Sequence, residues 1–140
     1  PAKQKVPIKK IEVSAGIIVK NKKVYIQQRA KGGLMGRLWE FPGGKREKDE
    51  SPEDCLKREI KEELRADITI LNKVMTIKHN YTQFRVTLHV FNCCLNGRRL
   101  RPSTREQWKW VLPAKLNKYP FPAANVKIVK YMTDEIIKVN

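Results

Sequence analysis

The sequence predicts an α+β protein in which helices and a β-sheet stack as an α/β/α sandwich. Segments rich in β-branched residues fall into two groups, within residues 11–41 and within residues 67–112. A helix with an apolar stripe is expected between the groups, and an amphipathic helix follows the second. This order of strands, helix, strands and helix is typical of layered folds. The chain has 140 residues, which is enough for one domain with a buried core.

The first group of strands is expected to open with a hairpin. Residues 11–20 and 23–28 flank Asn21-Lys22, which is a suitable turn. Residues 38–41 form a short strand that stops at Pro42-Gly43-Gly44, where glycine allows the backbone to turn tightly beside a ligand.

The second group begins after the central helix. Strands are expected at 67–78, 81–94 and 107–112. Asn96-Gly97 is the strongest hairpin-turn signal in the chain. One helical turn at 113–118 and a helix at 124–138 complete the chain. The three tryptophans are expected mainly in the core rather than as stacking platforms: Trp39, Trp108 and Trp110.

The central helix lies in the most acidic part of a basic chain. Residues 47–63 contain eight of the fourteen acidic residues and four basic ones, a net charge of −4, whereas the whole chain carries +16. Ser51-Pro52 is a typical helix start, because serine caps the first turn and proline is tolerated at the first helical position. An apolar stripe at four-residue spacing then predicts a helix over residues 52–64: Leu56, Ile60 and Leu64.

Three carboxylates share one flank of this stripe, because residues three and four apart are neighbours on a helix: Glu59, Glu62 and Glu63. Crowded carboxylates repel one another unless a cation lies between them, and oxygen ligands in this number favour Mg²⁺ or Mn²⁺. The alternative is an ordinary solvated acidic face with pairs such as Glu53–Lys57.

The spacing around the helix resembles a known signature. Gly44 is followed by five residues and Glu50, and then by seven residues and the run Arg58-Glu59-Ile60-Lys61-Glu62-Glu63. This pattern resembles the Nudix box, the signature of the Nudix hydrolase family. The resemblance implies the Nudix fold, with a mixed β-sheet between helices, and metal-dependent hydrolysis of a phosphoanhydride. Arg65 stands where the family usually has glycine after the helix, but it replaces no metal ligand.

The resemblance also implies roles for individual residues. By position, Mg²⁺, or Mn²⁺ as a substitute, would be held by Glu59, Glu62, Glu63 and the Gly44 carbonyl. We therefore expect Glu62 and Glu63 to be essential for turnover.

Two further residues of the box would hold the site together, and a candidate general base lies outside the box. Arg58 would orient a box carboxylate, and Glu50 would brace the loop and helix through Arg58. The general base of this family often lies outside the box, and Glu106 is the candidate; the alternative is an ordinary loop acid.

Outside the box, two short motifs are similar to a subgroup of the family. Residues 38–44 (LWEFPGG), with Arg29, and residues 121–125 (FPAAN) resemble the MutT-like hydrolases, which convert 8-oxo-dGTP to the monophosphate and pyrophosphate. In that subgroup the asparagine of the second motif recognises the oxidised guanine. Asn125 takes this position, and Arg29 and Glu40 are expected to contact the substrate as well. The alternative for Asn125 is a helix N-cap.

The same motifs, and residues 79–88 (HNYTQFRVTL), also resemble the C-terminal domain of the adenine glycosylase MutY, which reads 8-oxoguanine in DNA. We expect a Mg²⁺-dependent nucleotide pyrophosphohydrolase acting on 8-oxo-dGTP or a related nucleotide, with a MutY-type recognition domain as the alternative. A Nudix enzyme for another nucleotide, such as a pyrimidine triphosphate or ADP-ribose, is a third possibility.

Charge and cysteine content bear on partners and location. The excess of Lys and Arg implies a polyanion such as a nucleoside triphosphate, or duplex DNA if the chain belongs to a glycosylase. No apolar run is long enough to cross a membrane, and three cysteines form neither a disulfide framework nor a zinc pattern. A cytoplasmic protein with reduced thiols is expected. Residues 1–10 are interpreted as a basic tail or tether and residues 11–140 as the Nudix domain.

Overall fold

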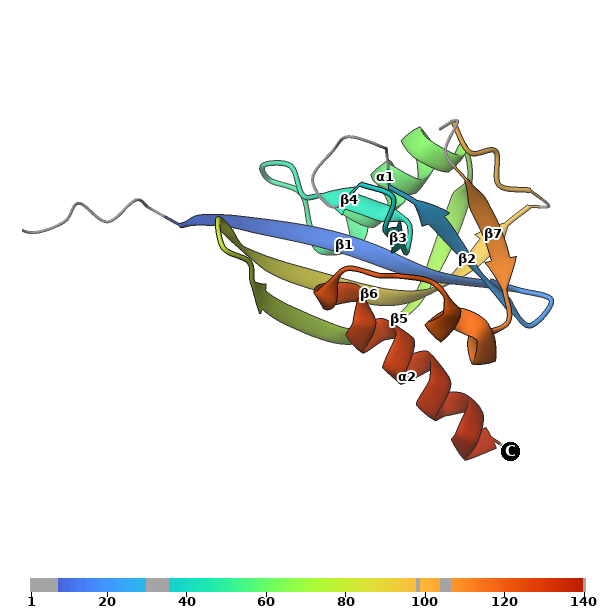
Figure 1. The fold of residues 1–140 in the computed structure, drawn as a ribbon. Helices are drawn as coiled ribbons and strands as arrows, with labels where there is room; N and C mark the ends of the chain where they lie inside the picture. The colour runs from blue at the N-terminus through green and yellow to red at the C-terminus, as the bar shows by residue number, and fades with distance from the viewer. Residues whose placement is uncertain (1–7, 30–35, 98, 104–106, 140) are drawn as a thin grey trace, which may run out of the picture.

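The computed structural model describes residues 8–29, 36–97, 99–103 and 107–139. Seven strands form one mixed sheet, with helices on both of its faces (Figure 1). The elements in chain order are β1 (Lys9–Lys20), β2 (Lys23–Gln28), β3 (Trp39–Glu40), β4 (Gly43–Lys45), α1 (Pro52–Leu64), β5 (Asp67–Asn80), β6 (Phe84–Asn96), β7 (Trp108–Val111), η1 (Pro113–Lys118) and α2 (Ala123–Val139).

Strand β1 is the element to which most of the others are attached. It pairs in parallel with β6 along most of its length, from Lys9 opposite Phe84 to Ile18 opposite Cys93. It also pairs antiparallel with β4 near its middle and with β2 at its end. Strand β5 pairs antiparallel with β6, whereas β3 and β7 pair antiparallel with β2. The sheet is therefore mixed, and the predicted fold class is confirmed.

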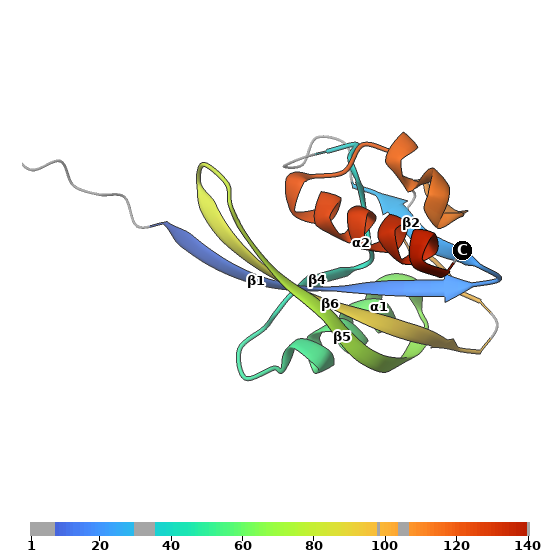
Figure 2. The same ribbon diagram turned by 90° about the horizontal axis from the view of Figure 1, so that it is seen from below.

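Side chains that point alternately to the two faces of the sheet divide the hydrophobic core into two layers. Ile17 of β1 packs in a cluster with Leu116 of η1 and Ile128 of α2, whereas the next residue, Ile18, packs with Leu56 and other residues of α1. Successive side chains of a strand point to opposite faces, so the two helices must cover opposite faces of the sheet. Figure 2 shows this arrangement, with α2 on one side of β1 and α1 on the other.

Helix α1 has the predicted bounds and the predicted cap. The Oγ of Ser51 accepts a hydrogen bond from the Asp54 N–H at 3.1 Å, and Pro52 occupies the first helical position. The apolar stripe is fully buried. The helix ends at Arg65, which adopts the left-handed conformation (φ 50°, ψ 39°) and donates its N–H to the Lys61 carbonyl. The turn that glycine usually makes is thus kept, with an arginine in it.

The hairpin of β1 and β2 and the helical turn at residues 113–118 are confirmed, although β1 starts at Lys9 rather than at residue 11. The hairpin expected at Asn96-Gly97 is wrong. Both edges of β6 are already paired, with β1 and β5, so a returning strand has no free edge to join. Instead Leu100 is buried beside α1, and the Arg101 N–H bonds to the Leu64 carbonyl at 2.7 Å. The chain therefore crosses the end of α1 before β7 pairs with β2.

The expectation for the tryptophans also needs correction. Trp39 is buried, but Trp108 is 44% exposed on β7, because that strand lies at an edge of the sheet. Within the part of the chain that the structure describes, no helix is long and apolar enough to cross a membrane.

Arg65 gives the fold its first testable prediction. A non-glycine residue in the left-handed region is strained by its Cβ, which glycine lacks. We expect the free energy of unfolding of Arg65→Gly to exceed that of Arg65→Ala by about 1 kcal/mol in urea denaturation. Both variants lose the same exposed side chain, so the difference between their free energies of unfolding reports the effect of the backbone conformation at position 65. An Arg65→Ala protein as stable as Arg65→Gly would contradict the strained geometry.

Candidate active site

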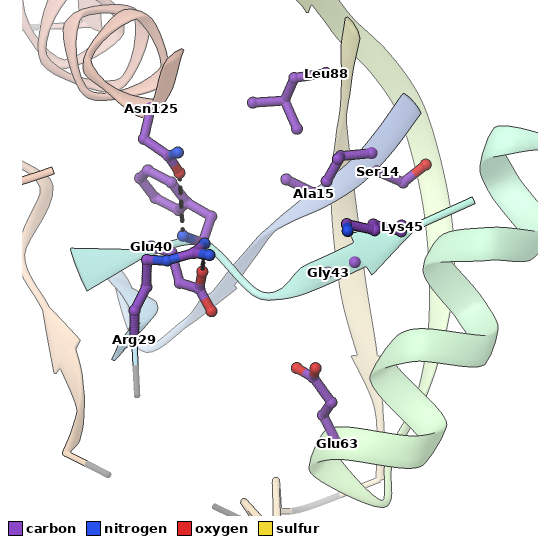
Figure 3. Close-up of a pocket in the computed structure, with 12 residues that line it drawn as sticks. Ser14, Ala15, Arg29, Glu40, Gly43, Lys45, Glu63, Leu88 and Asn125 are labelled. Atoms are coloured by element: carbon purple, nitrogen blue, oxygen red, sulfur yellow. Dashed lines mark hydrogen bonds and ion pairs between the residues drawn. The ribbon is translucent and has the colours of Figure 1, made fainter. Parts of the chain in front are cut away.

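A cavity of about 350 Å³ opens beside β1, and it joins the acidic helix to the start of α2 (Figure 3). Its lining residues include Gly44 and Glu63 of the acidic segment together with Phe41 and Asn125. Figure 3 shows Asn125 and Leu88 on the side of the cavity opposite Glu63. The sheet thus brings together residues that lie far apart in the sequence.

Two glycines allow the close packing that forms the box end of the cavity. In β4, Gly43 pairs with Ala15 and Gly44 pairs with Ser14. A Cβ on Gly43 would collide with the Ser14 carbonyl, and a Cβ on Gly44 would collide with the Glu59 carboxylate. Because glycine has no Cβ, Gly43 allows β4 to approach β1, and Gly44 allows Glu59 of α1 to approach β4.

Arg58 is the central cation of the box. Its Nε and Nη2 donate to the two carboxylate oxygens of Glu50 at 2.6 and 3.0 Å. Its Nη1 donates to Glu59 at 2.8 Å and to Glu62 at 3.3 Å. Nη2 also donates to the Lys45 carbonyl at 3.0 Å, which attaches the helix to β4. One guanidinium therefore donates hydrogen bonds to three carboxylates and to a strand, and it also forms an ion pair with Glu47 at 3.6 Å.

These contacts change the ionisation of the groups involved. The hydrogen bonds from Arg58, followed by one from the Glu47 N–H, lower the pKa of Glu50 from 4.5 to about 2. Hydrogen bonds to Glu50 raise the pKa of Arg58 further above its usual value. Both groups are therefore charged throughout the physiological range, and the pair is a permanent brace between the loop and the helix.

Glu63 lies on the other side of the box, and no cation among the described residues forms an ion pair with it. Gln27 donates to it at 3.4 Å and to Glu40 at 2.9 Å. Burial raises the pKa of Glu63 to about 7, against the lowering effect of the Gln27 hydrogen bond, and the nearby charges of Glu59, Glu40 and Glu62 raise it further. The negative charge at this end of the cavity is therefore incompletely neutralised by the protein.

The side chains are not gathered around one point as they stand. Among the described residues, no three His, Cys, Asp or Glu side chains form a group that could hold a metal ion. The reason is that Arg58 holds Glu59 and Glu62, while Glu63 faces Gln27. The chemistry of the set nevertheless fits a hard divalent cation, because the donors are all oxygens and their mutual repulsion is unrelieved at Glu63.

Arg29 and Glu40 line the same cavity between its two ends. They form an ion pair at 2.6 Å, and Glu40 also accepts from Gln27. Sequence reasoning missed Gln27, which is only 5% exposed and connects Glu40 with Glu63. The available signal was a polar residue on the buried face of β2, two positions after the buried Tyr25.

Asn125 is not the N-cap of α2, so that alternative is wrong. It is the third residue of the helix, and its N–H already bonds to the Pro122 carbonyl. Its Oδ1 accepts from the Phe41 N–H at 3.4 Å, which holds the amide at the cavity wall. Glu106, the candidate general base, lies outside the described residues.

Comparison with known proteins identifies the family. The NUDIX domain family matches residues 14–131. An 8-oxo-dGTP diphosphatase of Proteus vulgaris is 42% identical over 84 residues, which cover 59% of this chain and 75% of that protein. A CTP pyrophosphohydrolase of Escherichia coli (strain K12) is 30% identical over 123 residues, covering 88% of this chain and 91% of that protein.

Solved structures agree with the sequence relatives. The solution structure of the MutT protein, a Nudix hydrolase, from methicillin-resistant Staphylococcus aureus 252 is 32% identical and has a TM-score of 0.76, covering 92% of this chain and 99% of that one. These relatives give no support to the alternative of a MutY-type recognition domain. The box geometry, the fold and the relatives together show that the chain belongs to the Nudix hydrolase family, in its MutT-like subgroup, and is a nucleotide pyrophosphohydrolase.

Proposed function

We propose that the chain hydrolyses 8-oxo-dGTP, or a closely related purine nucleoside triphosphate, to the monophosphate and pyrophosphate with Mg²⁺. One observation carries the proposal: a single cavity has the box glutamate Glu63 at one end and the amide of Asn125 at the other. This arrangement suits a substrate with phosphates at one end and a base at the other. Similarity to the Proteus vulgaris 8-oxo-dGTP diphosphatase supports an oxidised purine nucleotide as the substrate.

At the box end, we assign Glu59, Glu62, Glu63 and the Gly44 carbonyl as metal ligands. Mg²⁺, or Mn²⁺ in its place, would supply charge neutralisation and an activated water there. Arg58 makes two hydrogen bonds to Glu50 but one each to Glu59 and Glu62. The bidentate pair with Glu50 is the stronger attachment, so Arg58 can release the other two carboxylates and stay in place. Glu106 remains the proposed general base.

At the base end, the available space supports a bulky ligand. An adjoining cavity of about 430 Å³ shares several wall residues with the first and continues between the outer end of β1 and the start of α2: Val13, Arg29, Lys45, Leu88 and Asn125. Its remaining walls include the aromatic rings of Tyr81 and Phe84. A primary amide offers both a donor and an acceptor to a purine edge. Arg29 and Glu40 would border the sugar and phosphates between the two ends.

A pyrimidine substrate is the second candidate. It is supported by the similarity to the Escherichia coli relative, a CTP pyrophosphohydrolase whose match covers 88% of this chain.

With either substrate, the enzyme would act on free nucleotides in the cytoplasm. The free thiols of Cys55, Cys93 and Cys94 would remain reduced there. Removal of an oxidised nucleotide would protect DNA from its incorporation.

The Glu50–Arg58 brace predicts a specific dependence of stability on pH. Because the pKa of Glu50 is lower in the folded protein, its stabilisation is present above about pH 4.5 and is lost as the pH falls toward about 2. Glu50→Gln should be less stable than wild type at neutral pH, and the difference should shrink over this acid range. Urea unfolding at a series of pH values measures this difference in the free energy of unfolding. Glu53→Gln is the charge-matched control, because Glu53 is exposed. A difference that stays constant down to pH 2 would contradict the brace.

The metal assignment predicts loss of turnover in two conservative variants. Glu62→Gln and Glu63→Gln each keep the shape of the side chain but remove a charged ligand. We expect kcat to fall about 100-fold or more in each, because charge neutralisation and water activation are both weakened. The control is again Glu53→Gln, which removes one charge from the same helix.

Turnover should be measured over a range of Mg²⁺ concentrations, so that weaker metal binding is separated from a slower chemical step. Wild-type kcat in both variants at saturating Mg²⁺ would exclude the assignment of these glutamates.

Base selection by Asn125 is tested with two variants. Asn125→Ala removes the whole amide, whereas Asn125→Asp keeps an oxygen to accept from the Phe41 N–H, replaces the donor with an acceptor and adds a negative charge. An unpaired buried polar group costs about 1–3 kcal/mol, so either variant should reduce the preference for 8-oxo-dGTP over dGTP by about 5- to 150-fold in kcat/KM.

Melting curves accompany these assays. A lowered melting temperature with an unchanged preference ratio in both variants would show that Asn125 only holds Phe41 and does not select the base.

A further inference from the structure

A further cavity of about 390 Å³, called here the second cavity, lies on the α1 side of the sheet and shares no lining residue with the two adjoining cavities of the proposed active site. Cations and two indole rings line it: Lys20, Arg99, Leu100, Arg101, Trp108 and Trp110. Among the described residues that line it, none is acidic. The active-site cavity, by contrast, contains two glutamates, Glu40 and Glu63. The second cavity is therefore suited to an anion without a bound metal ion.

Trp108 is a preformed aromatic platform in this cavity. Its ring stacks on Tyr25 with ring centroids 6.2 Å apart and an angle of 30° between the planes. Tyr25 is fully buried, and Trp110 packs against its edge. Trp108 is thus supported from below while 44% of it remains exposed. A large apolar ring held rigidly at the surface can stack with a flat ligand at little cost in entropy.

The two arginines belong to the described segment 99–103, whose backbone is held in place. Leu100 lies between them in the sequence and is only 9% exposed, packed in the cluster that includes Leu64 and Tyr25. The Arg101 N–H bonds to the carbonyl at the end of α1. Arg99 and Arg101 are therefore presented to solvent by an anchored backbone.

Lys20 reaches the cavity from a different element. It pairs with Lys23 at the end of the β1–β2 hairpin. Lys23 and Tyr25 lie on the same face of β2, because alternate residues of a strand share a face. Lys20 therefore stands on the same face as Trp108 and Trp110, and the positive charge of the cavity comes from two separate parts of the fold.

An aromatic platform surrounded by cations complements a nucleobase that is linked to phosphates. A free triphosphate concentrates its charge and is usually held by a metal ion or a cradle of backbone N–H groups. The charges here are instead spread over two elements around a stacking surface, the arrangement typical of grooves that follow the backbone of a single strand. The net charge of +16 favours the same polyanion.

We propose that this second cavity binds single-stranded nucleic acid, with a base stacked on Trp108 and backbone phosphates contacting Arg99, Arg101 and Lys20. The proposal is independent of the nucleotide that the active site hydrolyses.

Binding of a fluorescent oligothymidylate of about 12 nucleotides, followed by anisotropy, tests the proposal. Trp108→Leu should weaken binding about 5- to 150-fold, because base stacking is lost, whereas Trp108→Phe should keep most of the affinity. Arg101→Gln should reduce the slope of log K against log salt concentration by about 0.7, the value of one phosphate contact to a single strand. Lys130→Gln is the matched control, because Lys130 is exposed on α2, which covers the opposite face of the sheet.

Three outcomes would overturn the proposal. The first is an unchanged affinity of Trp108→Leu for the oligonucleotide. The second is an equal change in the slope of log K against log salt concentration in Arg101→Gln and Lys130→Gln, which would indicate attraction by net charge alone. The third is equally tight, Trp108-dependent binding of dTTP or of heparin, which would assign the cavity to a free nucleotide or to polyanions in general. Melting curves and nucleotide hydrolysis by each variant establish that the protein is folded, so a failure here is distinct from a failure of the proposed enzymatic function.

Discussion

The site depends on the hydrogen bonds by which Arg58 holds the carboxylates of α1. Glu59 and Glu62 of α1 would repel each other and Glu63, and Glu50 adds a further carboxylate from the loop just before the helix. One guanidinium binds Glu50, Glu59 and Glu62. The same group bonds to the Lys45 carbonyl, so it fixes α1 against β4. Because the pair with Glu50 is bidentate, Arg58 can brace the loop and still release Glu59 and Glu62 to the proposed metal ion. The contacts of Arg58 thus hold the box together and are compatible with the proposed metal ligation.

The sheet converts this local arrangement into a site with two ends. β1 pairs with β4, which places the glycines of the box beside Ser14 and Ala15, and it pairs with β6, which carries Leu88 to the cavity wall. The helix α2 then brings Asn125 to the far end, where it bonds to the residue that follows β3. The proposed metal-binding end and the proposed base-binding end are therefore connected through one strand, and the sheet sets their separation.

Local signals in the sequence were sufficient for α1, whose cap, stripe and end all lie within a few turns of chain. Long-range pairing was not predictable in the same way. The Asn96-Gly97 turn signal failed because both edges of β6 are occupied by strands distant in the sequence. Trp108 was assigned to the core because its hydrophobicity is visible in the sequence, whereas the position of β7 at the sheet edge is not. The box residues could be named because their spacing resembles the Nudix box, whereas the position of Gln27 between Glu40 and Glu63 is visible only in the structure.

The products that the wild-type protein releases distinguish the proposed cleavage from other ways of hydrolysing a triphosphate. Each of 8-oxo-dGTP, dGTP and CTP should be incubated with the enzyme in the presence of Mg²⁺ and, separately, with a chelator. We predict release of the monophosphate and pyrophosphate, with 8-oxo-dGTP as the best substrate and no turnover when the metal is removed. Release of the diphosphate and inorganic phosphate, or full turnover in the chelator, would contradict it.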